Sequence, residues 1–175
     1  MPRQLRYSVA MSLDGYIAGP NGEFDWIPMD PDHDFAGQWA QVDTLLMGRK
    51  TFEIMKHSPK RKKKPSDKNL VVCSKTLDPK IWRYITILPE VTADAINALR
   101  AGPGKDIWLF GGGELFRSLA ALGLVDTVEV GVIPIMLGGG VPALPPPASR
   151  VNLTLVNHKV YPKTGMLGLE YAVRK

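Results

Sequence analysis

Two segments of the chain combine glycines with the start of a helix, an arrangement that holds phosphate groups. The run from Asp106 to Phe116, DIWLFGGGELF, is typical of a buried strand, a glycine turn and the first turn of a helix. Glycines let the backbone approach a ligand closely, and the unpaired N–H groups of a first helical turn favour an anion. The run therefore predicts a phosphate site, although the segment alone leaves open tight strand-to-helix packing without a ligand.

Two familiar glycine motifs do not fit this run. The dinucleotide motif G-x-G-x-x-G needs a small residue where Phe116 stands. The P-loop needs Ser or Thr after Gly-Lys, but Gly104 and Lys105 are followed by Asp106. We therefore expect neither a Rossmann domain nor a P-loop ATPase.

The second segment begins with the short apolar strand Thr44–Met47 and continues as Gly48, Arg49, Lys50 and Thr51. Arg49 supplies a planar charged fork that suits a phosphate monoester, Lys50 a second charge, and Thr51 a hydroxyl at the helix N-terminus. Two such turns predict one long ligand, a dinucleotide that carries an extra phosphate. The alternative is that the two cations are only solvated and that Thr51 only caps the helix.

The composition favours one globular domain that has no nucleic acid as its partner. The chain has 175 residues and is 45% apolar, which is enough for one full core. Its net charge of +5 comes from the run Lys60–Lys64, because the remaining 17 basic residues balance 17 acidic ones. We interpret that run as a solvated loop and not as part of a basic binding face.

Neither a membrane span nor a metal site is predicted. No apolar run approaches the length of a span, and Asp14 interrupts the hydrophobic N-terminal stretch, so we expect a cytoplasmic protein. The single cysteine, Cys73, excludes an internal disulfide and is expected in the core. His33, His57 and His158 lack the spacing of metal ligands.

The elements that would position these residues alternate between strand and helix and then change to strands alone. Residues 5–12 alternate apolar and polar side chains, which is the two-residue period of a strand. Because the last strands follow one another without helices, they predict antiparallel pairs that finish a mixed sheet. The predicted class is therefore α/β, in one domain over residues 1–175. Strands are expected at 5–12, 44–47, 70–73, 84–88, 106–110, 127–133, 153–160 and 169–173, and helices through Phe35, Trp39 and Val42, from Thr92 to Gly102, and through Leu115, Leu119 and Leu122.

Several motifs in one order resemble dihydrofolate reductase. They are SLDGYIA at 12–18, MGRKT at 47–51 and GGGEL at 111–115. Ile133-Pro134 and the LGGG at 137–140 make the chain more similar still to dihydrofolate-reductase-like proteins that share the C-terminal reductase domain of the riboflavin-biosynthesis deaminase/reductase. The resemblance covers nearly the whole chain. It implies a single three-layer α/β/α domain with a mixed, mainly parallel central sheet and antiparallel C-terminal strands.

The resemblance also implies NADPH as the cofactor. Ser74 and Lys75 fall where the family contacts the adenosine side and its 2′-phosphate, and Ala10 and Ile17 fall where it contacts the nicotinamide. The charges of Arg49 and Lys75 give a reason to prefer NADPH over NADH. The residues expected to bind the cofactor are Ala10, Ile17, Gly48, Arg49, Lys50, Thr51, Ser74, Lys75, Gly111, Gly112, Gly113, Glu114 and Leu115.

The chemistry implied by the family is reduction of a small nitrogen heterocycle, which needs a proton source as well as the cofactor. The family places a carboxylate after the first loop, where this chain offers Asp30, Asp32 and Asp34, with the last two preferred as catalytic residues. Each of those two is equally explained as a helix cap. Trp26 and Phe35 are expected either to form an aromatic wall for a flat substrate or to be core residues.

Three functional hypotheses remain open. The first is a 5-amino-6-(5-phosphoribosylamino)uracil reductase of the riboflavin-biosynthesis type, although Phe110 stands where those enzymes carry an acidic residue. The second is reduction of a dihydropterin, and the third is NADPH binding without turnover. Deamination is excluded, because one cysteine cannot supply the zinc site of the deaminase domain. We also expect a homodimer, with the apolar segment Ile135–Pro147 as a contact surface.

Overall fold

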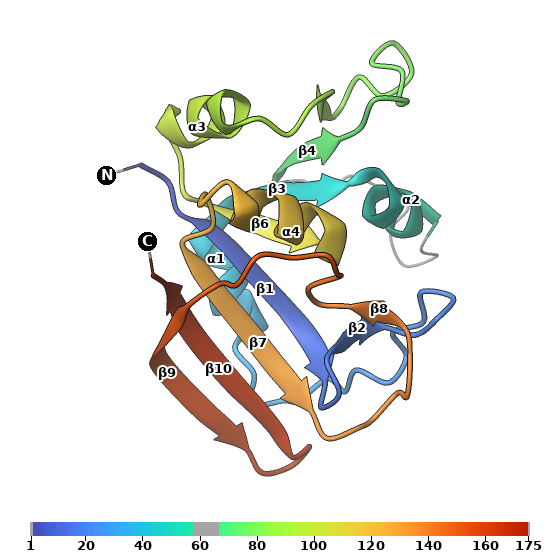
Figure 1. The fold of residues 1–175 in the computed structure, drawn as a ribbon, viewed down its shortest axis with the longest axis vertical. Coiled ribbons are helices and arrows are strands. Elements are labelled where there is room, and N and C mark those ends of the chain that lie inside the picture. Colours follow the sequence, from blue (N-terminus) through green and yellow to red (C-terminus); the bar gives the residue numbers. More distant parts are fainter. Residues whose placement is uncertain (1, 58–66, 175) are drawn as a thin grey trace.

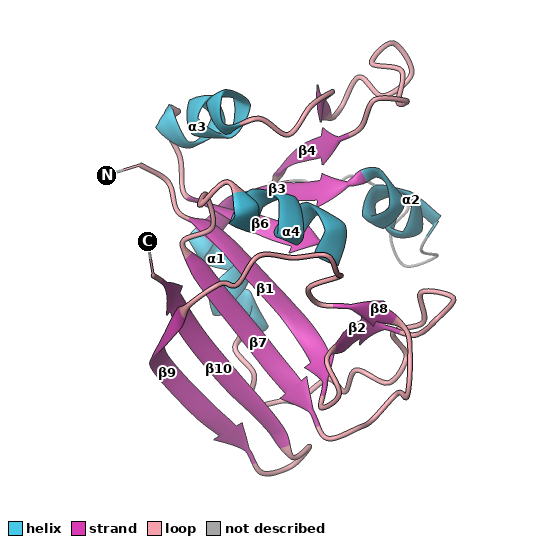
Figure 2. Ribbon diagram, viewed as in Figure 1, coloured by secondary structure: helices cyan, strands magenta, loops and turns pink. Residues whose placement is uncertain are grey.

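The computed structural model describes residues 2–57 and 67–174 and has the predicted α/β architecture (Figures 1 and 2). The basic run Lys60–Lys64 lies outside the described residues. The strands are β1 (Leu5–Ser12), β2 (Tyr16–Ala18), β3 (Val42–Gly48), β4 (Asn69–Cys73), β5 (Thr86–Leu88), β6 (Asp106–Gly111), β7 (Thr127–Ile133), β8 (Val141–Pro142), β9 (Leu153–Tyr161) and β10 (Met166–Val173), and the helices are α1 (Phe35–Gln41), α2 (Arg49–His57), α3 (Ala93–Ala101) and α4 (Gly113–Ala121).

An eight-stranded sheet runs through the molecule in the order β5-β4-β3-β6-β1-β7-β10-β9. The strands from β5 to β7 in this order are parallel, whereas β10 pairs antiparallel with both β7 and β9. The predicted mixed sheet with antiparallel C-terminal strands is confirmed. β6 lies between β3 and β1 in the sheet and is parallel to both. The carboxyl ends of β3 and β6 therefore lie side by side.

The helices cover both faces of the sheet and so form the predicted three layers (Figure 2). Ile96 of α3 and Leu119 of α4 are buried with Leu46, Leu109 and their neighbours on one face. On the other face, side chains of α1 and α2 pack on a second cluster that includes β3, β4 and Trp108 of β6. The helices thus place the start of α4 on one face and the start of α2 on the other.

The predicted alternation in β1 is confirmed, and it directs two kinds of side chain to opposite faces. Leu5 and Tyr7 are buried on the face of α4, where the Tyr7 ring stacks on Phe116 with 4.0 Å between the ring centroids. Burial of large apolar rings against each other is worth about 0.5–1.5 kcal/mol beyond the area removed from water. Arg6 and Ser8 therefore face the side of α1.

Several element boundaries differ from those predicted. Val42 begins β3 instead of continuing α1, because the helix ends at Gln41 and the backbone is extended at Val42. Leu122 is 45% exposed, because α4 ends at Ala121 and Leu122 caps it. β5 covers only Thr86–Leu88, so it is shorter than the expected strand over 84–88, and β10 begins three residues before the expected strand.

The loop after β1 contains a short strand that the sequence pattern did not predict. β2 pairs antiparallel with β8, and the two make a small second sheet beside the carboxyl end of β1 (Figure 1). Gly140 closely approaches the Ala18 backbone here, where a side chain would collide. The segment Ile135–Pro147 is thus tied to the loop that follows β1. No helix of the described residues is long and apolar enough to cross a membrane.

Candidate functional site

The carboxyl edge of the sheet brings the two predicted phosphate segments together. Gly48 ends β3 in register with Cys73 of β4, and Met47 is in register with Gly111 at the end of β6. Because parallel strands end at the same edge, α2 and α4 both begin there. Cys73 itself is partly buried, as expected for a core residue, and burial raises the pKa of its thiol to about 11.

Thr51 links the two segments. A Cβ atom built on Gly111 would lie 3.6 Å from Thr51 Oγ1, and one built on Gly112 would lie 3.7 Å from the same atom. Gly111 has a φ of 138°, a conformation that favours glycine. The hydroxyl at the start of α2 therefore faces the glycine turn before α4, and the prediction that the two turns form one site is supported by this geometry.

The glycines at this edge differ in the space beside them. No heavy atom of the described residues lies within 4 Å of a Cβ built on Gly48, apart from the neighbouring residues in the chain. At Gly113, by contrast, a Cβ would collide with the Pro142 carbonyl and lie 2.9 Å from Pro145 Cδ and 3.0 Å from the Ala143 carbonyl. Open space is thus found beside Gly48, whereas the segment after β8 fills the space beside Gly113.

The first turn of α2 carries the cations predicted to bind phosphate. Arg49 and Lys50 are exposed, and Arg49 Nη1 donates a 2.8 Å hydrogen bond to Glu53 Oε1 one turn later. That ion pair is 44% and 40% exposed at its two side chains, so water weakens it. Arg49 can exchange this contact for an anion at the edge with little loss.

The start of α4 offers backbone donors in place of side-chain charge. Gly112 is the N-cap residue and has no side chain to cap the helix, and Leu115 is buried beneath it. The Glu114 carboxylate accepts a 2.8 Å hydrogen bond from Arg117 and is 74% exposed. The Glu114 carboxylate thus pairs with Arg117 on the surface of α4. The backbone N–H groups of the glycine turn are therefore the part of this segment that can face an anion.

Ser74 and Lys75 follow β4 at the same edge. The buried Ser74 hydroxyl accepts hydrogen bonds of 3.1 and 3.2 Å from the backbone N–H groups of Thr76 and Leu77, which shapes a turn. The Lys75 ammonium lies 3.3 Å from Glu90 and is 74% exposed. Lys75 therefore remains available to a phosphate at the outer end of the edge.

The loop after β1 is fastened to the segment after β7 by Asp14. Its carboxylate accepts hydrogen bonds from Ser12 Oγ at 2.6 Å, from Leu137 N at 3.1 Å and from Gly138 N at 2.7 Å. The Ser12 hydroxyl and the two backbone N–H groups hold the pKa of Asp14 below its usual value, and partial desolvation opposes them. The half-buried Ile17 lies in the strand just beyond this clamp.

The Asp14 clamp gives a pH-dependent prediction. Because the folded-state pKa is lowered, its stabilisation is present above the unfolded-state pKa of about 4 and is lost as the pH falls through the folded value. We expect Asp14→Asn to unfold at a lower temperature than wild type near neutral pH, with the difference shrinking below about pH 4. Thermal unfolding of both proteins across that range is the measurement, and a pH-independent difference would contradict the clamp.

The two aspartates predicted to be catalytic lie at the start of α1. Asp34 is the N-cap residue and accepts a 2.8 Å hydrogen bond from Gly37 N. Asp32 lies 3.1 Å from the Lys163 ammonium and is about half exposed. Asp30 is instead buried, accepts a 2.6 Å hydrogen bond from Thr164 Oγ1, and has its pKa lowered chiefly by that bond.

The two aromatic residues predicted to contact substrate lie in separate clusters on the α1 side. Phe35 lies 5.8 Å from Trp39 and 6.1 Å from Trp108, measured between ring centroids. Trp26 packs with Ala10 on the cluster around Ile133. Phe35 is 43% exposed and so is not a core residue, whereas Trp26 is partly buried; the aromatic wall stays a prediction.

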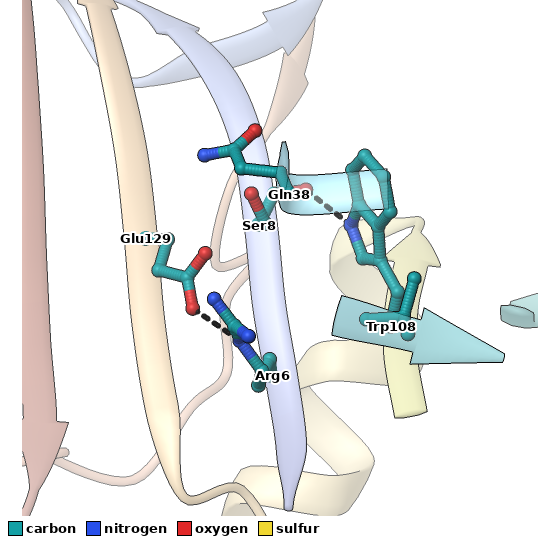
Figure 3. A pocket seen from close by; sticks show the side chains of 6 residues that line it. Arg6, Ser8, Gln38, Trp108 and Glu129 are labelled. Carbon is teal, nitrogen blue, oxygen red and sulfur yellow. Dashed lines mark hydrogen bonds and ion pairs between the residues drawn. The ribbon is translucent and has the colours of Figure 1, made fainter. Parts of the chain in front are cut away.

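Between these clusters a hollow opens over the middle of the sheet (Figure 3). About 210 Å³ of empty space lies around it, but this volume includes open solvent, and the enclosed part has room for about one water molecule. Its polar lining was not predicted, because the residues are far apart in the sequence. A signal was nevertheless present, since a charged residue interrupts the apolar run Thr127–Ile133. The lining residues are Arg6, Ser8, Gln38, Val42, Trp108 and Glu129.

A buried ion pair forms one wall of this hollow. Arg6 Nε donates a 2.7 Å hydrogen bond to Glu129 Oε1, and the two side chains are 14% and 11% exposed. Burial lowers the pKa of Arg6, but the hydrogen bond and charge of Glu129, with Asp106 adding to them, hold it above the usual value. Removing either partner would leave an uncompensated charge, which is costly in a partly dry site.

Comparison with known proteins places the whole chain in one group. A family model described as the RibD C-terminal domain matches residues 3–167. The protein YyaP of Bacillus subtilis (strain 168) is 35% identical over 179 residues, covering 97% of this chain and 94% of the relative.

Solved structures support the same grouping. The crystal structure of a putative riboflavin biosynthesis protein from Shewanella sp. PV-4 superposes with a TM-score of 0.84 at 26% identity, covering 100% of both chains. Dihydrofolate reductase from Enterococcus faecalis, complexed with NADP(H), superposes with a TM-score of 0.69 at 18% identity and covers 98% of this chain and 97% of its own. The dihydrofolate reductase-like fold is therefore confirmed.

Proposed function

The chain belongs to the RibD C-terminal domain family, and from this membership we propose that it is an NADPH-dependent reductase of a small nitrogen heterocycle. Its most specific form is the 5-amino-6-(5-phosphoribosylamino)uracil reductase reaction of riboflavin biosynthesis. The family supports a reductase, and the site geometry supports the cofactor. A cytoplasmic location, the absence of a nucleic-acid partner and the absence of a metal remain predictions.

One observation carries the proposal for the cofactor. The turns that begin α2 and α4 meet at Thr51, and open space lies beside Gly48 next to the exposed cation Arg49. Backbone N–H groups, a hydroxyl and a guanidinium are the donors that hold phosphates. A ligand with two phosphate groups and a phosphate monoester fits this donor set better than a single anion does.

We assign the parts of the cofactor to residues along the edge. The diphosphate would be held by Gly48, Thr51 and the turn Gly111–Gly113. The 2′-phosphate would be held by Arg49 and Lys75. Lys50 would add charge, while Ser74 shapes the adenosine end. Ala10 and Ile17 would contact the nicotinamide, which supplies a hydride when bound.

Asp32 and Asp34 remain the candidates for the acid that assists protonation. Their side chains already have partners, in Lys163 and in the start of α1. A catalytic role therefore requires that at least one carboxylate also reach the substrate, as a general acid must come within hydrogen-bond distance.

The test is oxidation of NADPH, followed by its absorbance, with the phosphoribosylamino-pyrimidine of the riboflavin pathway and with dihydrofolate. We expect turnover with the pyrimidine, reduced in either Asp32→Asn or Asp34→Asn if that residue assists protonation. Turnover with dihydrofolate alone would favour the second candidate function. Tight NADPH binding without turnover across both substrates would instead support a non-catalytic NADPH-binding protein.

We also propose that the protein is a homodimer. Large apolar side chains are exposed at Met136, in the segment Ile135–Pro147, and at Val156 and Val160 of β9, beside a sheet face that no helix covers in Figure 1. A second copy would remove such surface from water. Sedimentation is expected to give about twice the 19.3 kDa chain mass, and a monomer at micromolar concentration would contradict the proposal.

A further inference from the structure

The Tyr7 hydroxyl is a buried polar group at the meeting point of three elements of the proposed cofactor site. The Tyr7 side chain is 1% exposed, and its hydroxyl donates a 3.1 Å hydrogen bond to the Ala143 carbonyl. Burial raises the pKa of this hydroxyl well above its usual value, so the group stays a neutral donor. A phenylalanine ring would fill nearly the same space, so the hydroxyl contributes the hydrogen bond and not the packing.

The Ala143 carbonyl that accepts this bond also packs on the glycine turn before α4. Its oxygen would lie 3.0 Å from a Cβ atom built on Gly113, and the neighbouring Pro142 carbonyl would collide with that atom. The Tyr7 ring itself stacks on Phe116, one turn further along α4. The segment after β8 thus crosses β1 beside the start of α4 (Figure 1), and the Tyr7 side chain contacts both this segment and the helix.

Ala143 also holds the loop that follows β1. Its backbone N–H donates a 3.0 Å hydrogen bond to the Gly15 carbonyl. Gly15 lies two residues before Ile17 of β2, the residue expected beside the nicotinamide. Ala143 therefore receives the Tyr7 hydroxyl on its carbonyl and holds the nicotinamide-facing loop with its N–H.

The loop after β1 and the segment Ile135–Pro147 form one connected piece. β2 pairs with β8, and the Asp14 carboxylate fastens the loop to the other end of the segment. Arg117 of α4 also reaches the segment, at the Pro146 carbonyl, but its bond is 3.4 Å long and exposed. The buried Tyr7 hydroxyl is therefore well placed to set the position of the whole piece against β1 and α4.

We propose that Tyr7 is a positioning residue of the cofactor site, whose hydroxyl acts through Ala143 to hold the nicotinamide-facing loop in place relative to the glycine turn before α4. The two ends of a dinucleotide would contact these two elements, so their separation must match the length of the ligand. A loop that is held in place before binding loses less conformational entropy when the nicotinamide docks. This inference rests on the proposed function, because it names a further residue of the same site.

The test is calorimetric binding of two ligands to wild type and to Tyr7→Phe. NADPH has both ends, whereas 2′-phospho-ADP-ribose keeps the diphosphate and the 2′-phosphate but lacks the nicotinamide. We expect Tyr7→Phe to bind NADPH about fivefold more weakly, because the loop is no longer held by this hydrogen bond, and to bind 2′-phospho-ADP-ribose as wild type does. A merely structural Tyr7 would change both affinities by the same factor.

A control variant and a second measurement keep the test independent of general effects on the fold. Tyr171→Phe removes a hydroxyl from a half-buried tyrosine that packs on the same core cluster but lies on β10, two strands away from β1. It should bind both ligands as wild type does. Amide hydrogen exchange without ligand should be faster at Ala143 in Tyr7→Phe than in wild type, because the bond to Gly15 opens more often, and unchanged within α4.

The outcomes separate this inference from the proposal about the cofactor. If wild type binds NADPH and Tyr7→Phe weakens both ligands equally, or neither of them, the inference is wrong and the cofactor proposal stands. Equal exchange at the Ala143 amide in Tyr7→Phe and wild type would also overturn the inference. If wild type binds neither ligand, the proposed function fails, and the positioning role fails with it.

Discussion

Arg49→Ala is expected to weaken NADPH binding by about 10- to 100-fold, because a charge-assisted hydrogen bond to phosphate contributes about 1.5–3 kcal/mol. The guanidinium stands at the first position of α2, beside the open space at Gly48. Its partner Glu53 is itself exposed, so the loss of that ion pair should cost the fold little. Calorimetric titration of NADPH into both proteins measures the change.

Two controls show whether the charge acts on the 2′-phosphate. NADH lacks that group, so its affinity should change much less than that of NADPH if Arg49 recognises it. Glu53→Gln should leave NADPH affinity equal to wild type or raise it slightly, because it releases Arg49 from its ion pair. Unchanged NADPH affinity in Arg49→Ala would contradict this assignment of the cofactor phosphates.

Gly113→Ala is expected to lower the free energy of unfolding by about 3 kcal/mol or more, because no space exists for the added methyl group. The methyl would meet the Pro142 and Ala143 carbonyls and Pro145 Cδ, so the segment after β8 would have to move. Alanine is normally the better helix residue by about 1 kcal/mol, which is too little to offset such a collision. Chemical denaturation of both proteins measures the loss.

Gly102→Ala is the matched control for that substitution. Gly102 has a φ of −65° and follows α3, and an added Cβ would make an ordinary contact of 3.6 Å with the Leu99 carbonyl. Its free energy of unfolding should stay within about 0.5 kcal/mol of wild type. If Gly113→Ala were equally mild, the packing described between α4 and the segment after β8 would be incorrect.

Features that depend on local sequence were predicted well. The alternating residues of β1, the Thr92 cap of α3 and the glycine turn before α4 are each determined by neighbours in the chain. The two glycine turns predicted one long ligand, and the structure supplies the physical reason why they can share it. β3 and β6 are parallel neighbours, so Gly48 and Gly111 lie at the same edge of the sheet.

Features that depend on contacts distant in sequence were not predicted. The stacking of Tyr7 on Phe116 and the pairing of Arg6 with Glu129 join residues more than 100 positions apart. The alternation of β1 placed Arg6 on the polar face of the strand but indicated no partner for it, because the neighbouring strand β7 could not be identified from periodicity. The hollow under α1 was missed for the same reason.

For the candidate catalytic carboxylates, sequence-based prediction failed for a different reason. The residues before α1 predicted a helix cap at Asp34, and the family resemblance implied a catalytic acid there; the cap is confirmed by its bond to Gly37, and the catalytic role stays a prediction. A cap and a proton donor use the same residue types at the same place, so the sequence could not separate them. Glu129, which faces the hollow, could be recognised only after β1 and β7 were seen to be adjacent.

Titration of NADPH into wild type and Gly48→Ala tests the central claim most directly. The added methyl group would enter open space, so the free energy of unfolding should not change, while NADPH should bind about tenfold or more weakly because the cofactor needs that space. Gly102→Ala should bind NADPH as wild type does. Tight NADPH binding that is the same in Gly48→Ala as in wild type, or no NADPH binding by wild type at all, would contradict a cofactor site at this edge of the sheet.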